Sequence, residues 1–199
     1  EMVFRKNLKK KFALISVYDK KKLKFLCLNL IKNNYGLIST GTTGEKIRSM
    51  GFSCIDISKI TKLKEMFNGR IKTLNPLIYA SLLYKRDDEK HIKTFLSLKV
   101  PNINIVVVNL YPFEKNKRNN NAIEMIDIGG PSLLRAASKN FKFVTPIIST
   151  NDYGKLINNI NKNNGETDLN FRKKMAYKVF KETSKYDNVI SAWFNENKK

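Results

Sequence analysis

The chain has 199 residues and a formal net charge of +21 at pH 7, because 38 lysines and arginines face only 17 acidic residues. This length suits one α/β domain with a single sizeable core, and the 42% of hydrophobic residues exclude a chain that is disordered by composition. No apolar run approaches the roughly 18 residues that are needed to span a bilayer, and residues 1–11 lack the apolar core of a signal peptide. We therefore expect a cytoplasmic protein with no membrane partner.

The excess of positive charge has two explanations. A basic chain can bind nucleic acid, but these lysines are spread along the whole sequence and form no arginine cluster. The chain also contains 24 asparagines, and lysine and asparagine share codons rich in A and T, so a biased genome explains both excesses. We expect no nucleic-acid partner, although a positive field would help to recruit a phosphorylated substrate.

Residues that commonly bind metals are few. Cys27 and Cys54 lie in apolar stretches, which is typical of buried free thiols. His91 is the only histidine and lies among lysines, so it is expected to be a solvated helix residue. The sequence therefore predicts no metal site and no disulfide.

The N-terminal part begins with a strand and a helix. Residues 12–17 form a short apolar run that predicts a buried strand. Asp19 is then expected to cap a helix whose apolar residues recur at helical spacing and which ends at Asn33 and Asn34.

Two more strands and a loop are predicted next. Residues 36–39 and 52–57 predict the second and third strands, and the segment 40–44 opens a short helix between them. Residues 58–73 lack clear periodicity and predict a loop. The Asn-Pro pair at 75–76 predicts the start of a helix, with a capping side chain and a proline in the first turn.

The second half continues the alternation of strands and helices. Residues 103–110 form the strongest strand pattern, and such a continuous apolar run is typical of a strand buried on both faces. A helix follows residues 129–132, and residues 143–148 predict another strand. The chain from about residue 151 is mostly helical, with a long last helix capped by Asp168.

Strands that alternate with helices indicate parallel βαβ units. The predicted fold class is therefore α/β, in three layers (α/β/α), with a mostly parallel sheet of about five strands and a helical C-terminal segment. We predict one domain over residues 1–199, with its core at about 12–150 and C-terminal helices at about 151–199.

In this fold class, ligands bind at the carboxyl ends of the strands. A loop over residues 68–76 is expected to fold over this edge of the sheet, and four segments are expected to lie there, namely 16–20, 39–44, 109–113 and 126–130.

The segment 40–44, Thr-Gly-Thr-Thr-Gly, has the composition of an anion site. Glycines let the backbone approach a ligand closely, and the free N–H groups of a helix start favour an anion. Lys20 is a candidate countercharge. The same composition is common in ordinary turns, and the Gly-Lys-Ser/Thr ending of a nucleotide P-loop is missing.

Asp127 precedes Gly129 and Gly130 at another predicted helix start, where a carboxylate commonly caps the helix. Lys139 lies about two and a half turns into that helix among small and apolar neighbours, so we expect it to point inward. A lysine next to a carboxylate is typical of a functional site, and a structural ion pair is the alternative.

Three motifs, in this order, carry a resemblance to a known family. They are Gly69-Arg70-Ile71-Lys72-Thr73-Leu74, Val108-Asn109-Leu110-Tyr111-Pro112-Phe113, and Ile126-Asp127-Ile128-Gly129-Gly130 with the helix that follows it to Asn140.

The chain resembles the IMP cyclohydrolase portion of the bifunctional AICAR transformylase/IMP cyclohydrolase of purine biosynthesis, from about Phe12 to Phe194. Tyr186-Asp187 is also similar to the family pattern. The resemblance does not include the transformylase domain, and it implies a methylglyoxal-synthase-like fold.

The resemblance implies the ring closure of formamido-imidazole-carboxamide ribotide. The carboxamide nitrogen attacks the formyl carbon and water leaves. Both reacting groups belong to one molecule, so the enzyme mainly holds a near-attack geometry and manages charge. The resemblance therefore implies a purine ribotide as the small-molecule partner, with no cofactor and no metal, and it leaves a homodimer open.

The resemblance also implies roles for individual residues. The ribotide phosphate would be bound by Ser16, Lys20, Thr40, Gly41 and Thr43. The oxyanion that develops on the formyl group would be stabilised by Lys72 and Tyr111. The proton at the carboxamide would be handled by Asp127 and Lys139, and a carboxylate–lysine pair titrates as a unit. The base and its carboxamide would be positioned by Arg70, Thr73, Asn109, Ile128, Gly129 and Gly130.

This sequence departs from the family pattern at a few positions. Tyr18 stands where the family usually has serine, and Thr42 replaces a usual glycine. Asn75 and Phe141 each replace a usual histidine, which argues against a mechanism that uses histidine.

Two rival functions fit the same fold. The segment 40–44 is also similar to the phosphate loop of methylglyoxal synthase, but that enzyme's Gly-Gly-Asp segment and its histidine have no counterpart here. An allosteric nucleotide-binding module, like the one that ends carbamoyl phosphate synthetase, would not need Lys72, Tyr111, Asp127 and Lys139 together.

Overall fold

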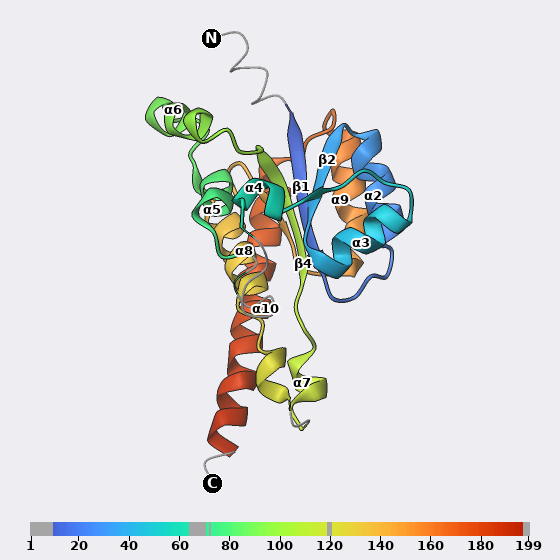
Figure 1. Ribbon diagram of the computed structural model, residues 1–199, viewed down its shortest axis with the longest axis vertical. Coiled ribbons are helices and arrows are strands. Elements are labelled where there is room, and N and C mark those ends of the chain that lie inside the picture. Colours follow the sequence, from blue (N-terminus) through green and yellow to red (C-terminus); the bar gives the residue numbers. More distant parts are fainter. Residues whose placement is uncertain (1–9, 64–70, 72, 119–120, 197–199) are drawn as a thin grey trace.

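A parallel sheet of five strands forms the centre of the protein (Figure 1). The computed structural model describes residues 10–63, 71, 73–118 and 121–196. The strands follow the order β3-β2-β1-β4-β5, and every neighbouring pair is parallel. Their bounds are Lys11–Val17 for β1, Tyr35–Ser39 for β2, Ile55–Asp56 for β3, Ile103–Asn109 for β4 and Thr145–Ile147 for β5.

The three middle strands of the sheet, β2, β1 and β4, are buried. In the register, Leu14 of β1 lies between Ile38 of β2 and Val106 of β4, and all three side chains are fully buried. A parallel sheet needs helices on both faces, so its central strands are apolar on both sides.

Helices cover both faces of the sheet (Figure 1). Side chains from α2 and α9 build one core, including Leu26, Leu30 and Leu156, and side chains from α5, α8 and α10 build the other, including Leu82 and Leu133. The bounds are Leu23–Lys32 for α2, Gly41–Ser49 for α3, Pro76–Leu83 for α5, Gly129–Lys139 for α8, Tyr153–Lys162 for α9 and Leu169–Glu196 for α10.

Further helical elements lie in the connections between these elements. They are α4 (Ser58–Thr61), α6 (Glu89–Leu98), α7 (Phe113–Asn116) and the 3-10 turns η2 (Ala122–Met125) and η3 (Thr150–Asp152). The last helix, α10, has 28 residues, and its C-terminal half extends past the end of the sheet next to α7 (Figure 1).

The three-layer α/β/α class, the parallel sheet of five strands and the helical C-terminal segment are confirmed. Asn75 caps α5 as predicted, since its side chain accepts a hydrogen bond from the Leu77 amide, and the Asp168 carboxylate accepts one from the Phe171 amide at the start of α10. His91 is exposed on α6, as predicted.

Several details differ from the predictions. Asp19 does not cap α2: its carboxylate accepts from the Lys21 amide, and the helix begins only at Leu23, after Lys22 has turned the chain in a left-handed conformation. Strands β3 and β5 begin later than predicted because the preceding amides bond to the end of a helix: Phe52 to the Ile47 carbonyl of α3, and Phe143 and Val144 to the Asn140 carbonyl after α8. Residues 58–61 form a short helix inside the predicted loop.

The two cysteines are free, but only Cys27 is buried, whereas Cys54 is half-buried. Burial raises the pKa of the Cys27 thiol to about 12, so this thiol remains protonated at neutral pH. Within the described part of the chain, no helix combines the length and apolar composition that a membrane span requires.

Candidate functional site

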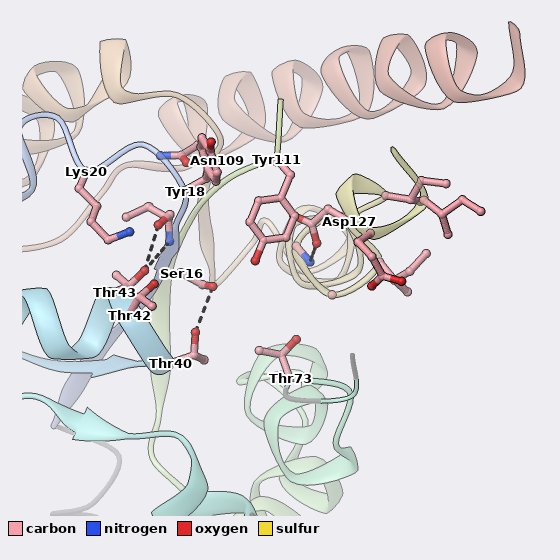
Figure 2. A pocket seen from close by; sticks show the side chains of 17 residues that line it. Ser16, Tyr18, Lys20, Thr40, Thr42, Thr43, Thr73, Asn109, Tyr111 and Asp127 are labelled. Atoms are coloured by element: carbon pink, nitrogen blue, oxygen red, sulfur yellow. Dashed lines mark hydrogen bonds between the residues drawn. The ribbon is translucent and has the colours of Figure 1, made fainter. Parts of the chain in front are cut away.

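A cavity of about 560 Å³ lies at the carboxyl ends of β1, β2 and β4, against the start of α8 (Figure 2). Ligands of open parallel sheets bind at this edge. Most of the predicted site residues line it, namely Ser16, Lys20, Thr40, Thr43, Thr73, Asn109, Tyr111, Asp127, Ile128, Gly129 and Gly130.

The start of α3 forms one end of this cavity. The first N–H groups of a helix have no intrahelical partner. Thr40 is the N-cap of α3, and its side chain makes no capping hydrogen bond to them. Gly41 has a φ of 38°, which favours glycine, and it makes the turn from β2 into the helix. Lys20 lies beside this helix start (Figure 2), so the geometry combines the features of an anion site.

The hydroxyl groups at this end hold the backbone together. The Thr43 hydroxyl donates to the Val17 carbonyl at 3.0 Å and accepts from the Val17 amide at 3.2 Å. The hydroxyl oxygens of Ser16 and Thr40 lie 3.3 Å apart, at hydrogen-bonding distance across the ends of β1 and β2. The Thr43 side chain therefore fixes the position of α3 against β1, and an anion would be met by the backbone N–H groups of α3 and by Lys20.

Asn109 also works through the backbone. Its side-chain amide donates to the Asp19 carbonyl at 2.9 Å and accepts from the Asp19 amide at 2.8 Å. This pair of bonds ties the loop after β1 to the end of β4, so Asn109 shapes the cavity wall.

The two glycines at the start of α8 provide space for neighbouring functional atoms. A Cβ atom on Gly129 would stand 2.5 Å from the Thr73 hydroxyl oxygen, and a Cβ atom on Gly130 would stand 2.4 Å from a carboxylate oxygen of Asp127. A Cβ atom at either position would force the neighbouring side-chain oxygen to move. The Gly-Gly pair thus lets Thr73 and Asp127 approach the helix start.

Asp127 forms the other end of the cavity, together with Tyr111 (Figure 2). Its carboxylate accepts from the Gly130 amide at 2.8 Å. Burial raises the pKa of Asp127, and the hydrogen bonds from the Gly130 and Tyr111 backbone amides oppose this shift only in part. A half-buried carboxylate with a raised pKa is a stronger base than an exposed one, so this group can accept a proton from a ligand.

Tyr18 stands next to Tyr111 at the mouth of the cavity. The two rings meet edge to face, with centroids 5.5 Å apart, and each side chain is a little under half exposed. The departure from the family pattern at Tyr18 therefore adds a contact to a predicted catalytic residue.

The comparisons with known proteins agree with this geometry. Residues 23–132, more than half of the chain, match the model of the MGS-like domain. The chain belongs to the MGS-like domain family. Residues 137–199 match the model described as the AICARFT/IMPCHase bienzyme.

The relatives of this MGS-like chain carry one name. The chain is 44% identical to the bifunctional purine biosynthesis protein PurH of Lactobacillus acidophilus, over 94% of this chain and 37% of that protein. It is 40% identical to PurH of Cereibacter sphaeroides, over 91% of this chain and 35% of that protein. The chain thus spans little more than a third of the curated relatives that it matches.

A solved structure has the same fold. The crystal structure of ForH superposes with a TM-score of 0.82 at 25% identity, over 94% of this chain and all of the ForH chain.

The MGS-like fold does not bring Lys139 to the cavity, so the prediction that this side chain points inward is wrong. Lys139 is the last residue of α8 and is exposed. A helix rises 1.5 Å per residue, so the 11 residues of α8 separate Lys139 from the Asp127 end by about 15 Å. Arg70 and Lys72 lie outside the described residues, and their roles stay predictions.

Several lining residues of the MGS-like site were not predicted. Tyr18 and Thr42 belong to segments expected at this edge, and their departure from the family pattern was the available signal. Ile123 and Glu124 lie on the 3-10 turn η2. No local pattern marks η2 as part of a site, because packing between distant segments places it there. In the described part of the chain, no three His, Cys, Asp or Glu side chains come together as a metal site would require.

Proposed function

We propose that this chain is an IMP cyclohydrolase, which closes the purine ring of 5-formamido-imidazole-4-carboxamide ribotide to give IMP in purine biosynthesis. One observation carries the proposal: a single cavity joins the N-terminus of α3, with Lys20 beside it, to a half-buried carboxylate that lies beside a tyrosine at the start of α8. A ribotide has the matching polarity, with a phosphate at one end and the reacting groups at the other. The name shared by the PurH relatives supports the same substrate class.

The mechanism assigns one role to each end of the cavity. The N–H groups of α3 and the Lys20 ammonium bind the phosphate and fix the position of the base. Asp127 accepts a proton from the carboxamide nitrogen as this nitrogen attacks the formyl carbon, and the Tyr111 hydroxyl donates to the oxygen that gains negative charge. That oxygen takes up the proton held by Asp127 and leaves as water with a second proton, which comes from the formamido nitrogen as the C=N bond forms, so the product differs from the substrate by one water molecule.

The proposal makes the chain a hydrolase acting on a cyclic amidine, named for the reverse reaction. Its partner is the small purine ribotide. The absence of nucleic-acid and membrane partners and the cytoplasmic location stay predictions, and a homodimer stays open. The absence of a cofactor or metal is also a prediction, since ring closure within one molecule needs positioning and proton transfer only.

The test is to incubate the purified protein with the formylated ribotide and follow IMP by its absorbance and by chromatography. We expect IMP from the wild type, before and after dialysis against EDTA, and almost none from Asp127→Asn. Binding of the ribotide without turnover would instead indicate an allosteric module. Release of inorganic phosphate from a triose phosphate would indicate a lyase like methylglyoxal synthase.

A further inference from the structure

Tyr186 of α10 is bonded to the backbone of the segment that carries Asp127. Its hydroxyl accepts a hydrogen bond from the Asp127 amide at 2.8 Å and donates one to the Met125 carbonyl at 3.0 Å. The partners are 59 and 61 residues apart in the sequence. One side chain thus pairs with an acceptor before Ile126, the Met125 carbonyl, and with a donor after it, the Asp127 amide.

A second aromatic residue of α10 holds the segment that follows Tyr111. The indole N–H of Trp193 donates to the Lys117 carbonyl at 2.8 Å, just after α7. Trp193 follows Tyr186 by seven residues, which is two helical turns, so both side chains lie on one face of α10. The buried ring of Phe113 in α7 meets both of them edge to face, with centroids 6.5 Å from Tyr186 and 5.7 Å from Trp193.

Hydrogen bonds act on these rings in addition to their packing. A cavity of about 510 Å³ borders Tyr111, Phe113 and Tyr186, together with residues of α10. The Phe113 ring packs on the rings of Tyr186 and Trp193. Ring contacts have no single partner atom, whereas the hydrogen bonds of Tyr186 and Trp193 join α10 to particular backbone groups of the two segments.

These bonds matter to the site because the position of the Asp127 carboxylate depends on the position of the Asp127 backbone. The carboxylate is held by the Gly130 and Tyr111 amides. Gly130 lies three residues after the Asp127 amide that Tyr186 binds, and Tyr111 lies two residues before Phe113, which packs on Tyr186 and Trp193. Tyr186 itself does not belong to the wall of the candidate cavity, so it has no direct contact with a ligand there.

We propose that Tyr186 is a positioning residue, and that the C-terminal half of α10 is a brace that sets the distance between Asp127 and Tyr111 for ring closure. The proposal rests on the proposed function. A misplacement of a reacting group by about 1 Å can cost about a hundredfold in rate. The brace acts on turnover, because the anion site at α3 is held by other contacts.

The main variant is Tyr186→Phe, which keeps the ring and removes the hydroxyl. We expect kcat for IMP formation to fall at least about tenfold, while KM and the dissociation constant of IMP change less than about twofold. Amide hydrogen exchange of residues 125–128 should accelerate at least about tenfold, since the Asp127 amide loses its acceptor. Trp193→Phe should give a smaller loss of kcat and faster exchange around Lys117.

The matched control is Tyr177→Phe, which removes a hydroxyl from the same helix at a side chain that is 69% exposed. It should match the wild type in kcat, exchange and melting temperature. A Tyr186→Phe variant with normal kcat, or with unchanged exchange at residues 125–128, would overturn the brace. Equal losses in kcat and in IMP affinity would indicate a general structural role and would also overturn it. If the wild type forms no IMP, the proposed function fails, and the exchange result alone then decides whether Tyr186 holds the Asp127 segment.

Discussion

The two ends of the candidate cavity are built in different ways. At the α3 end, the contacts join residues that are about 25 positions apart and belong to regular elements, as in the bonds of Thr43 to Val17 and of Thr40 to Ser16. At the α8 end, Asp127 stands on an irregular segment that is held by Gly130 nearby and by Tyr186 about 60 residues away. The first end follows directly from the βαβ order of the chain, whereas the second depends on long-range contacts.

This difference predicts that the two ends of the cavity have separate roles in binding and in turnover. The α3 end should determine how tightly a phosphorylated ligand binds, and the α8 end should determine how fast it reacts. A variant at one end should therefore change one kinetic constant and leave the other almost unchanged.

The largest effect is expected for Asp127→Asn. The variant should lower kcat at least about a hundredfold, the usual scale for the loss of a proton-transfer group, while IMP affinity changes less than about threefold. Glu124→Gln is the matched control, since it removes the same charge from the same cavity, and it should keep kcat within about threefold. Steady-state kinetics of both variants, with calorimetric titration of IMP, would decide this, and equal losses would refute a specific role for Asp127.

The pH dependence follows from the burial of Asp127. Because burial raises its pKa, the acid limb of kcat should lie above the ordinary range of an aspartate, and turnover should be lost as the pH falls through this raised pKa. The folded protein then binds the proton more tightly than the unfolded chain, so the ionised carboxylate costs stability at neutral pH. Asp127→Asn should gain more in melting temperature, relative to the wild type, at pH 7 than at pH 3.

An effect of intermediate size is expected for Gly130→Ala. The new methyl group would stand 2.4 Å from the Asp127 carboxylate, so the carboxylate must move, and kcat should fall about tenfold to a hundredfold. Gly154→Ala in α9 is the control, because a Cβ atom there meets no atom within 4 Å. It should leave kcat unchanged and raise the melting temperature slightly, as expected for alanine in a helix. Wild-type turnover in Gly130→Ala would show that the position of this carboxylate is not critical.

At the other end of the cavity, Lys20→Ala should weaken IMP binding about tenfold, the scale of one charged hydrogen bond, with kcat within about threefold. Lys21→Ala removes the same charge from an exposed neighbour that does not line the cavity, and it should change affinity less than about twofold. Titrations of IMP at low and high salt would distinguish a direct contact with Lys20 from attraction by the overall positive charge, because salt screens the overall field more strongly. Equal effects of the two lysines would reduce the role of Lys20 to its contribution to the net charge.

The smallest effect is expected for Lys139→Ala, since this lysine is exposed at the far end of α8. Its kcat should lie within about twofold of the wild type. A large loss would mean that Lys139 acts on the cavity of a second copy. Mixing the inactive Lys139→Ala and Asp127→Asn proteins would then restore activity, which would also establish a homodimer.

The sequence predicted the strands and the α3 end well, because these features depend on local patterns. The apolar run of β4 and the Thr-Gly-Thr-Thr-Gly segment are both continuous in the chain. Asp127 and its two glycines were also identified, although through a family resemblance. That resemblance could not supply the reason for the glycines, which is the space taken by Thr73 and by Asp127 itself.

The errors arise where distant contacts override local signals. Lys139 has small and apolar neighbours, which suggested an inward position, but these neighbours pack on the sheet and leave the lysine on the solvent side of the helix. Asp19 has the right residue type for a cap, but the tie between Asn109 and its backbone holds it before the helix. The role of Tyr186 needs the position of α10 relative to η2, which no spacing in the sequence encodes.

The Thr43 hydroxyl has a consequence for the sheet itself. Strand β2 ends at Ser39, opposite Ile15, so β1 reaches Val17 without a strand partner on that side. There the hydroxyl both gives and receives a hydrogen bond, as a peptide group of an adjacent strand would. Thr43 thus adds one more rung to the ladder with a side chain, and the backbone is free to become a helix two residues after Ser39. Serine could provide the same rung, whereas valine, with nearly the same shape, would leave the buried amide and carbonyl of Val17 unpaired, at a cost of about 1–3 kcal/mol for each group.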